Sequence, residues 1–251
     1  MATGSNDAVM RELASTGKLR VAIAVGPSAS ALWTVRDAAT GRPKGVPIEL
    51  GTAMAQKLGV PVELIEHESS GAIVNARDKN TWDVTFLPVD DDRKAMLDIG
   101  APYHLLQSTY LIAPGSTIKT LADANRAGVR AAIVDGTATG RAAVAASPSA
   151  TIVKVKTPDE AIEQMRAGKI DAIALSRESV GGLVAALPGS RVLDEAFLNS
   201  TTAVAVPKGR AAALAYVTAF IEEAKASGLV RRALDGMGLK SSQVAPAGMK
   251  A

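Results

Sequence analysis

The sequence predicts an α/β protein built from two lobes, and three observations lead to this fold class. Short apolar segments typical of buried strands alternate with amphipathic segments typical of helices, in the order β-α-β-α-β. The same alternation occurs a second time further along the chain. Two more strand-like segments, 105–113 and 201–207, bracket that second series. A chain that leaves one lobe, builds another and returns needs two such crossing segments.

The first series predicts a parallel sheet covered by helices. Residues 19–25 (LRVAIAV) form a short apolar run that ends at a Gly-Pro pair, as a buried strand does. Apolar residues at helical spacing precede Gly59, a natural helix stop, and either Ser69 or Ser70 can cap the next helix. The expected elements are strand 19–25, helix 48–58, strand 60–66, helix 69–77 and strand 82–87.

The second series predicts the other lobe. Its expected elements are strand 129–134, helix 137–146, strand 151–155, a helix from Thr157 to Gly168, strand 170–175 and helix 176–187. A long helix over 211–227, with one apolar face, then packs back on the first lobe. We therefore expect a discontinuous lobe 1 made of residues 1–107 and 201–251, and a lobe 2 made of residues 108–200.

Composition excludes several kinds of chemistry. The 251 residues contain no cysteine, which excludes disulfides, thiolate zinc sites and cysteine nucleophiles. The two histidines, His67 and His104, have no partner at metal-ligand spacing, so we expect neither a metal nor another cofactor. The chain carries no G-x-S-x-G elbow, P-loop or G-x-G-x-x-G string. Asp135 and Glu178 form the one plausible catalytic carboxylate pair.

Charge and hydropathy argue against nucleic-acid binding and against a membrane-spanning segment. The net charge of +3 is scattered along the chain, and eight aromatic residues leave little for base stacking, so no nucleic-acid partner is expected. No apolar run has the length of a membrane span. The first residues contain neither a basic segment nor an apolar segment of an export signal.

Several short strings, in this order and spacing, resemble one family. They are KGVPIEL at 44–50, WDV at 82–84, DDDRK at 90–94, APY at 101–103, DGT at 135–137, GKIDA at 168–172 and VPKG at 206–209. From Leu19 to about Leu239, the chain is similar to the bacterial solute-binding proteins of family 3, the amino-acid-binding receptors of ABC importers.

The resemblance implies an architecture and a set of partners. It implies a periplasmic-binding-protein-like fold of type II, in which two lobes joined by two crossing hinge strands close on a ligand. It also implies a periplasmic monomer that delivers its ligand to an ABC permease in the membrane. Since no signal is visible in the sequence, we expect a trimmed signal, with a cytoplasmic location as the alternative.

Arg93 is the first candidate ligand-binding residue. It follows three aspartates at the start of a short predicted helix, and from the residues alone Asp90–Asp92 cap that helix and Arg93 is a solvated neighbour. The resemblance implies instead that this arginine binds a ligand carboxylate with two parallel hydrogen bonds.

The second predicted lobe supplies the other candidates. Asp135, Gly136, Thr137 and Ala138 open a helix directly after a strand, where free backbone N–H groups favour an anion. Ser176 ends the strand 170–175, at the position where the resemblance implies an aspartate that neutralises a ligand ammonium. A serine hydroxyl cannot supply that charge, and the alternative is that Ser176 simply caps the next helix.

Apolar residues are expected to form the wall of the binding site. Residues 86–89 (FLPV) stand where relatives place hydroxyl residues, so Leu87 and Pro88 are expected to contact the ligand. Trp33 lies in the loop where relatives often place an aromatic residue over the ligand, and an ordinary core tryptophan is the alternative. His67 ends a predicted strand, on the edge where open sheets bind ligands.

These observations predict a solute-binding receptor without catalytic activity, which captures a small carboxylate or an amino-acid-like ligand. Because Ser176 replaces the expected aspartate, a carboxylate without a free amine is expected to bind better than an ordinary α-amino acid. The alternative is an enzyme similar to cyclohexadienyl dehydratase, which has the same fold.

Overall fold

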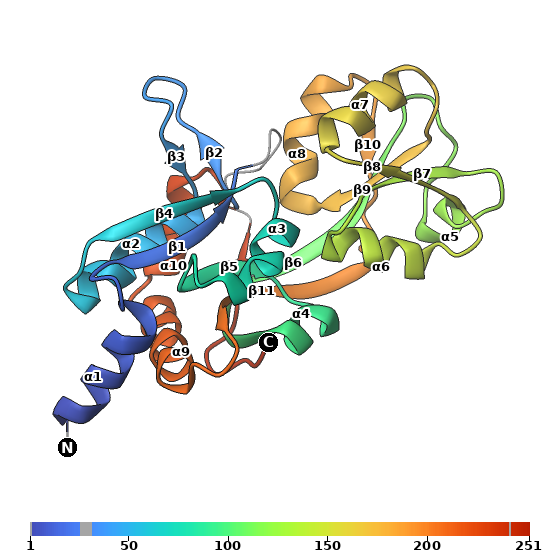
Figure 1. Ribbon diagram of the computed structural model, residues 1–251. Coiled ribbons are helices and arrows are strands. Elements are labelled where there is room, and N and C mark those ends of the chain that lie inside the picture. The colour runs from blue at the N-terminus through green and yellow to red at the C-terminus, as the bar shows by residue number, and fades with distance from the viewer. Residues whose placement is uncertain (1, 26–31, 241) are drawn as a thin grey trace. The chain divides into compact units, whose positions relative to one another are not determined.

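The computed structural model describes residues 2–25, 32–240 and 242–251, and its mixed α/β architecture confirms the predicted fold class (Figure 1). The chain divides into two compact units. Unit 1 comprises Met1–Leu105 and Thr201–Ala251, and unit 2 comprises Leu106–Ser200. Two strands, β6 (Leu97–Ile112) and β11 (Leu198–Pro207), each start in one unit and end in the other. No helix among the described residues is long and apolar enough to cross a membrane.

In unit 1 the central strands are parallel, as the alternation of strands and helices predicts. Strand β1 pairs in parallel with β4 and β5, and β11 pairs antiparallel with β5. The elements before the crossing strand β6 are α1 (Ala2–Leu13), β1 (Leu19–Ala24), β2 (Val35–Arg36), β3 (Pro43–Lys44), α2 (Val46–Leu58), β4 (Val62–His67), α3 (Ser70–Asn75), the 3-10 helix η1 (Arg77–Lys79), β5 (Val84–Pro88) and α4 (Asp91–Met96). After β11 come α9 (Ala211–Ala226), α10 (Leu229–Gly236) and β12 (Gln243–Val244).

Helix α2 approaches strand β1 closely because a glycine faces the strand. A Cβ atom on Gly51 would lie 2.9 Å from a methyl carbon of Val21, so a larger residue would push the helix away. Leu50 and Met54 of the same helix are fully buried. The strand therefore packs against backbone as well as side chains, which fixes the position of its carboxyl end.

Unit 2 is a smaller sheet with helices on both faces. Strands β9, β7 and β8 are parallel, and β6 pairs antiparallel with β9. One apolar cluster holds residues of α7 and α8 against the sheet, and another holds α5 and α6 on the opposite face. The elements are α5 (Leu121–Ala124), β7 (Arg130–Val134), α6 (Ala138–Ala146), β8 (Thr151–Val155), α7 (Pro158–Arg166), β9 (Ala172–Ser176), α8 (Arg177–Ala186) and β10 (Arg191–Val192).

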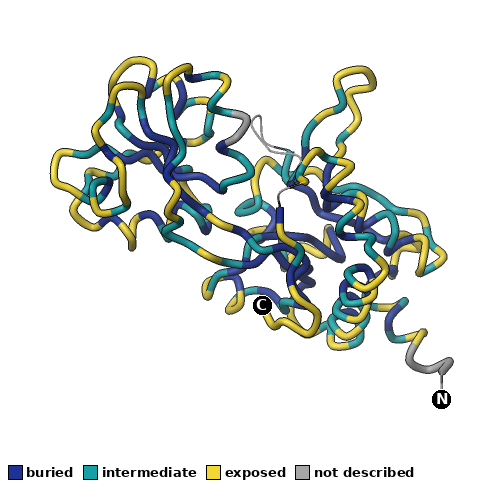
Figure 2. Tube along the Cα trace, turned by 180° about the vertical axis from the view of Figure 1, so that it is seen from behind, coloured by how far each residue is buried: buried dark blue, intermediate teal, exposed yellow. Residues whose placement is uncertain are grey.

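The N-terminal segment is a helix, although its sequence predicts only a polar lead. Val9 and Leu13 of α1 are buried, and Figure 2 shows dark, buried trace in the second half of this helix. The carboxylate of Glu12 accepts a hydrogen bond from the backbone N–H of Ala213 at 2.8 Å. Helix α9 has no side-chain cap of its own, so α1 supplies one.

Candidate functional site

In unit 1, candidate site residues lie at the carboxyl ends of the parallel strands, around Arg93. Asp90 caps helix α4, because its side chain accepts a hydrogen bond from the backbone N–H of Arg93 at 2.9 Å. The Arg93 side chain is not the solvated neighbour that capping alone predicts, since the residue is 2% exposed. Its guanidinium donates to the Pro88 carbonyl oxygen at 2.7 Å and to Ser70 Oγ at 2.8 Å.

The Arg93 guanidinium lacks an acidic partner. Burial lowers its pKa to about 10, which still leaves the group charged at neutral pH. Within the part of the chain that the structure describes, no carboxylate forms an ion pair with it. A buried cation held only by neutral oxygens is costly, and an anion in contact with it would recover much of that cost.

Ser70 is a candidate site residue that the sequence does not single out. Either Ser69 or Ser70 could have capped helix α3, and the structure assigns the cap to Ser69, whose Oγ accepts from Ala72 N–H at 3.1 Å. The Ser70 hydroxyl is therefore available to accept from Arg93. The only hint in the sequence is that two serines are adjacent, because just one of them can cap the helix and the other hydroxyl is left for a different contact.

The predicted wall residues of unit 1 have different surroundings. Leu87 is fully buried in the hydrophobic core, whereas Pro88 is half-buried and holds Arg93 through its carbonyl oxygen. Trp33 is half-buried and follows residues 26–31, which lie outside the described residues. His67 ends β4; burial lowers its pKa, and its buried Nε2 has no hydrogen-bond partner among the described residues.

In unit 2, the first candidate site residues lie where β7 leads into α6. Gly136 is exposed and has a φ of +71°, which favours glycine at this turn. Thr137 caps the helix: its Oγ1 accepts from Gly140 N–H at 3.0 Å and donates to the Val134 carbonyl at 2.8 Å. Ala138, the first helical residue, is buried, and the Asp135 carboxylate lies in solvent, 3.3 Å from Lys154 Nζ.

Ser176 belongs to a group of hydroxyls at the same sheet edge. It is 6% exposed and caps α8, and its Oγ lies 2.9 Å from Ser179 Oγ. Ser108 on β6 pairs in register with Ser176, and its Oγ lies 2.9 Å from Thr139 Oγ1 in the first turn of α6. Both readings of Ser176, as a cap and as a site residue, are therefore compatible with its position. The sequence gives no signal for Ser108 or Ser179.

The candidate residues of each unit, taken separately, favour anions. Unit 1 contributes a buried guanidinium, and unit 2 contributes hydroxyls beside the N-termini of α6 and α8, where orphan N–H groups and the helix dipole attract negative charge. No group of three or more histidine or acidic side chains in the described part of the chain could hold a metal ion.

The fold is that of two-lobe amino-acid-binding proteins. A mutant of ArgBP from T. maritima is 19% identical, with a TM-score of 0.77 over 93% of this chain and 99% of that one. An ancestral amino-acid-binding protein, described as a precursor of cyclohexadienyl dehydratase, is 24% identical, with a TM-score of 0.78 over 93% and 99%. A binding component of an ABC transporter from Wolinella succinogenes, complexed with lysine, is 19% identical, with a TM-score of 0.78 over 88% and 95%.

The family follows from the sequence match. Residues 21–236 match the bacterial extracellular solute-binding proteins, family 3, and the chain belongs to this family. The resemblance expected from the short strings is thereby confirmed. None of the curated proteins matches the chain.

Proposed function

We propose that the protein is the solute-binding receptor of an ABC importer and that it captures a small carboxylate. The observation that carries this proposal is the buried Arg93 guanidinium, which is held by the Pro88 carbonyl and the Ser70 hydroxyl without an acidic partner. In the proposed complex, Arg93 binds one end of the ligand and the N-terminus of α6 in unit 2 contributes N–H groups. The protein works as a periplasmic monomer that delivers its ligand to a membrane permease.

The proposed ligand lacks a free α-amine. A desolvated ammonium needs a carboxylate beside it, and the hydroxyls of Ser108, Thr139 and Ser176 cannot supply the charge. Related structures were solved with lysine or arginine bound, so ordinary amino acids are the natural comparison. We expect each 2-oxo acid to bind this protein more tightly than the α-amino acid with the same side chain.

A thermal-shift screen with matched pairs tests this proposal, because a ligand that binds only the folded state raises its melting temperature. Suitable pairs are pyruvate with alanine, 2-oxoglutarate with glutamate, and phenylpyruvate with phenylalanine. Stabilisation by the acids and not by their amino partners is expected. A screen in which only the amino acids stabilise the protein would contradict the amine argument and leave the receptor role intact.

Arg93→Ala then tests the carboxylate contact by calorimetry, with the best ligand from the screen. Loss of two charge-assisted hydrogen bonds should weaken binding about 100-fold or more. Arg77→Ala is the matched control, because Arg77 lies in the same unit and its guanidinium donates to the Val74 carbonyl. Equal affinities of wild type and Arg93→Ala would remove Arg93 from the site.

A dehydratase similar to cyclohexadienyl dehydratase is the second candidate, and one related structure is of a precursor of such an enzyme. Its chemistry would need a carboxyl group kept protonated in dry surroundings. The Asp135 side chain is 62% exposed and pairs with Lys154, which does not suit that role. Incubation with prephenate or arogenate should therefore give no aromatic product above background. Turnover that disappears in Glu178→Gln would establish the enzyme instead.

A further inference from the structure

Both units contain the same arginine–aspartate clip at the amino ends of their parallel strands. In unit 1, Asp83 accepts hydrogen bonds from Arg20 N, Nε and Nη2 at 3.0, 2.9 and 2.6 Å. In unit 2, Asp171 accepts from the same three atoms of Arg130 at 2.8, 2.9 and 2.7 Å. Arg20 is the second residue of β1 and Arg130 is the first residue of β7. Each aspartate directly precedes the neighbouring parallel strand, which is β5 in unit 1 and β9 in unit 2.

The equivalence of the two clips extends to the turn before each aspartate. The third guanidinium nitrogen, Nη1, donates to the carbonyl oxygen three residues before the aspartate: to Asn80 at 2.6 Å in unit 1 and to Gly168 at 2.8 Å in unit 2. Both of these residues are left-handed, with φ of +51° and +66°. Only Asn80 has a side chain, and its Oδ1 accepts from Arg20 Nη2 at 3.2 Å.

The antiparallel strand beside each clip is equivalent as well. If the register of β11 with β5 is continued by two residues, Pro207 lies opposite Asp83. If the register of β6 with β9 is continued by one residue, Ala113 lies opposite Asp171. Two residues later, each strand is followed by a glycine with positive φ, +82° in unit 1 and +73° in unit 2. The next residue is Arg210 in unit 1 and Ser116 in unit 2.

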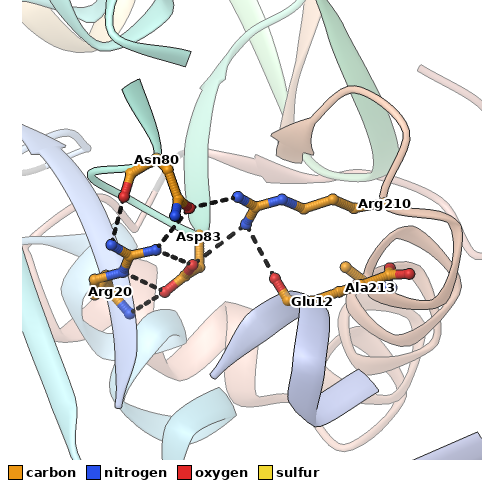
Figure 3. A network of polar contacts seen from close by, with 6 residues as sticks. All are labelled: Glu12, Arg20, Asn80, Asp83, Arg210 and Ala213. Carbon is orange, nitrogen blue, oxygen red and sulfur yellow. Dashed lines mark hydrogen bonds and ion pairs between the residues drawn. The ribbon is translucent and has the colours of Figure 1, made fainter. Parts of the chain in front are cut away.

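At the position where the two units differ, Arg210 in unit 1 and Ser116 in unit 2, unit 1 places a second guanidinium beside its clip. Figure 3 shows Arg210 seated between the clip and the end of α1. Its Nη1 lies 3.3 Å from Asp83 Oδ1 and 3.0 Å from the Glu12 carbonyl oxygen, and its Nη2 lies 3.0 Å from Asn80 Oδ1. The unit 1 clip is thereby closed off from solvent, with the Asp83 side chain fully buried.

In unit 2 the same position is an open groove of about 700 Å³. Ser116, Gly168 and Asp171 line it, so the two residues that differ from unit 1 are both smaller there. The Asp171 side chain is 30% exposed and that of Arg130 is 40% exposed. The clip that unit 1 covers with its own arginine is therefore accessible in unit 2.

Two helix C-termini at the groove provide partial negative charge for a cation. The last turns of α7 and α8, which end at Arg166 and Ala186, both line the groove, and helix C-termini carry partial negative charge. The positive side chains already present are engaged. Arg130 is bound by Asp171 and by the Gly168 carbonyl, and Arg166 Nη2 donates to the Ala186 carbonyl at 2.7 Å. The groove already binds guanidinium groups by carbonyl oxygens.

We propose that this groove is a docking site for the arginine side chain of a partner protein. The arriving guanidinium takes the place that Arg210 has in unit 1 and donates to Asp171 Oδ1 beside the clip. A guanidinium is the group that occupies the equivalent position in unit 1, where Arg210 Nη1 lies 3.3 Å from Asp83 Oδ1.

The test uses N-acetyl-L-arginine amide as the probe, with chemical-shift mapping on the full-length protein. This probe has no carboxylate for Arg93, so its binding does not depend on the proposed function. We expect saturable shifts at the amides of Gly115 and Gly168, weaker ones with N-acetyl-L-lysine amide, and none with N-acetyl-L-citrulline amide. Equal shifts with the uncharged citrulline probe, or none at the groove with the arginine probe, would overturn the proposal. Tighter binding there of free L-arginine would replace the partner protein by a free amino acid.

Three variants make the test specific to the groove. Gly168→Asn rebuilds the acceptor that Asn80 provides, and asparagine tolerates this backbone conformation, so the probe should bind about threefold more tightly. Gly168→Ala is the matched control, because it has the same backbone strain without an acceptor and should bring no gain. Ser116→Arg fills the groove from within and should weaken the probe at least tenfold. Circular dichroism checks that each variant is folded; unchanged affinity in both folded Gly168→Asn and folded Ser116→Arg would refute the assignment.

Discussion

Replacing Asp83 with asparagine should destabilise unit 1 severely while leaving its shape almost unchanged. The carboxylate is fully buried and accepts four hydrogen bonds, three from Arg20 and one from Arg210. The variant keeps both guanidinium groups, whose side chains are only 10% and 20% exposed, and removes the charge that balances them. Breaking a buried pair in this way costs about 3–5 kcal/mol.

The matched control is Asp171→Asn in unit 2. The hydrogen-bond geometry of this second clip is nearly the same, but its two side chains are 30% and 40% exposed. Water can replace the lost carboxylate there, so the loss of stability should be roughly half that of Asp83→Asn or less. The pair of variants thus separates the effect of burial from the effect of geometry.

The assay is urea unfolding followed by two signals. Trp33 and Trp82, the two tryptophans of the chain, both belong to unit 1, so fluorescence reports on that unit, whereas far-ultraviolet circular dichroism reports on both. Asp83→Asn should strongly lower the urea concentration at the midpoint of the fluorescence-detected transition, and it should lower the melting temperature by about 6–20 °C. Equal losses in the two variants would refute the argument that burial decides the strength of the clip.

Three further outcomes are expected. Burial lowers the pKa of His67 below its usual 6.5, so the unfolded state binds the proton more readily and the free energy of unfolding falls as the pH drops below about 6.5. His67→Gln should therefore flatten the plot of unfolding free energy against pH in this range, as measured by urea unfolding. Parallel plots for the wild type and the variant would contradict this prediction. Glu12→Ala removes the cap from Ala213 N–H and should cost about 1 kcal/mol, seen as a small fall in melting temperature that Glu12→Asp partly restores. Ser70→Ala should weaken ligand binding about fivefold in calorimetry without unfolding the protein, because Arg93 loses one of its two acceptors; an unchanged affinity would remove Ser70 from the site.

Most elements with a regular apolar period were predictable within a residue or two, but the crossing strand β6 begins at Leu97, eight residues before the predicted segment 105–113. Strand 151–155 has the predicted bounds, and the helix predicted over 211–227 is α9, Ala211–Ala226. Each of these patterns reports directly on which side chains face the core. Helix α1 was not predictable, because its contacts with α9 join segments about 200 residues apart and its own sequence is mostly polar.

The candidate site shows the same limit. Arg93 could be singled out from its string, but its burial and its bond to Ser70 depend on two helices that follow different strands. Ser116 and Gly168 carry no signal by themselves. They become informative only beside Arg210 and Asn80, after the two units have been compared position by position.

Charge balance gives the strongest statement about the ligand. In unit 1, the Arg93 guanidinium is buried and has no ion-pair partner among the described residues, and the hydroxyls around Ser176 in unit 2 are neutral. A monocarboxylate balances that charge, whereas the ammonium of an amino acid meets no counter-charge in this set. Ser176→Asp supplies one and should reverse the preference, so that glutamate binds more tightly than 2-oxoglutarate in calorimetry. Glu178, half-buried in the first turn of α8, is the carboxylate nearest in sequence. Tight binding of an ordinary amino acid by the wild type, undiminished in Glu178→Gln, would show that an ammonium is held without the carboxylate that this argument requires.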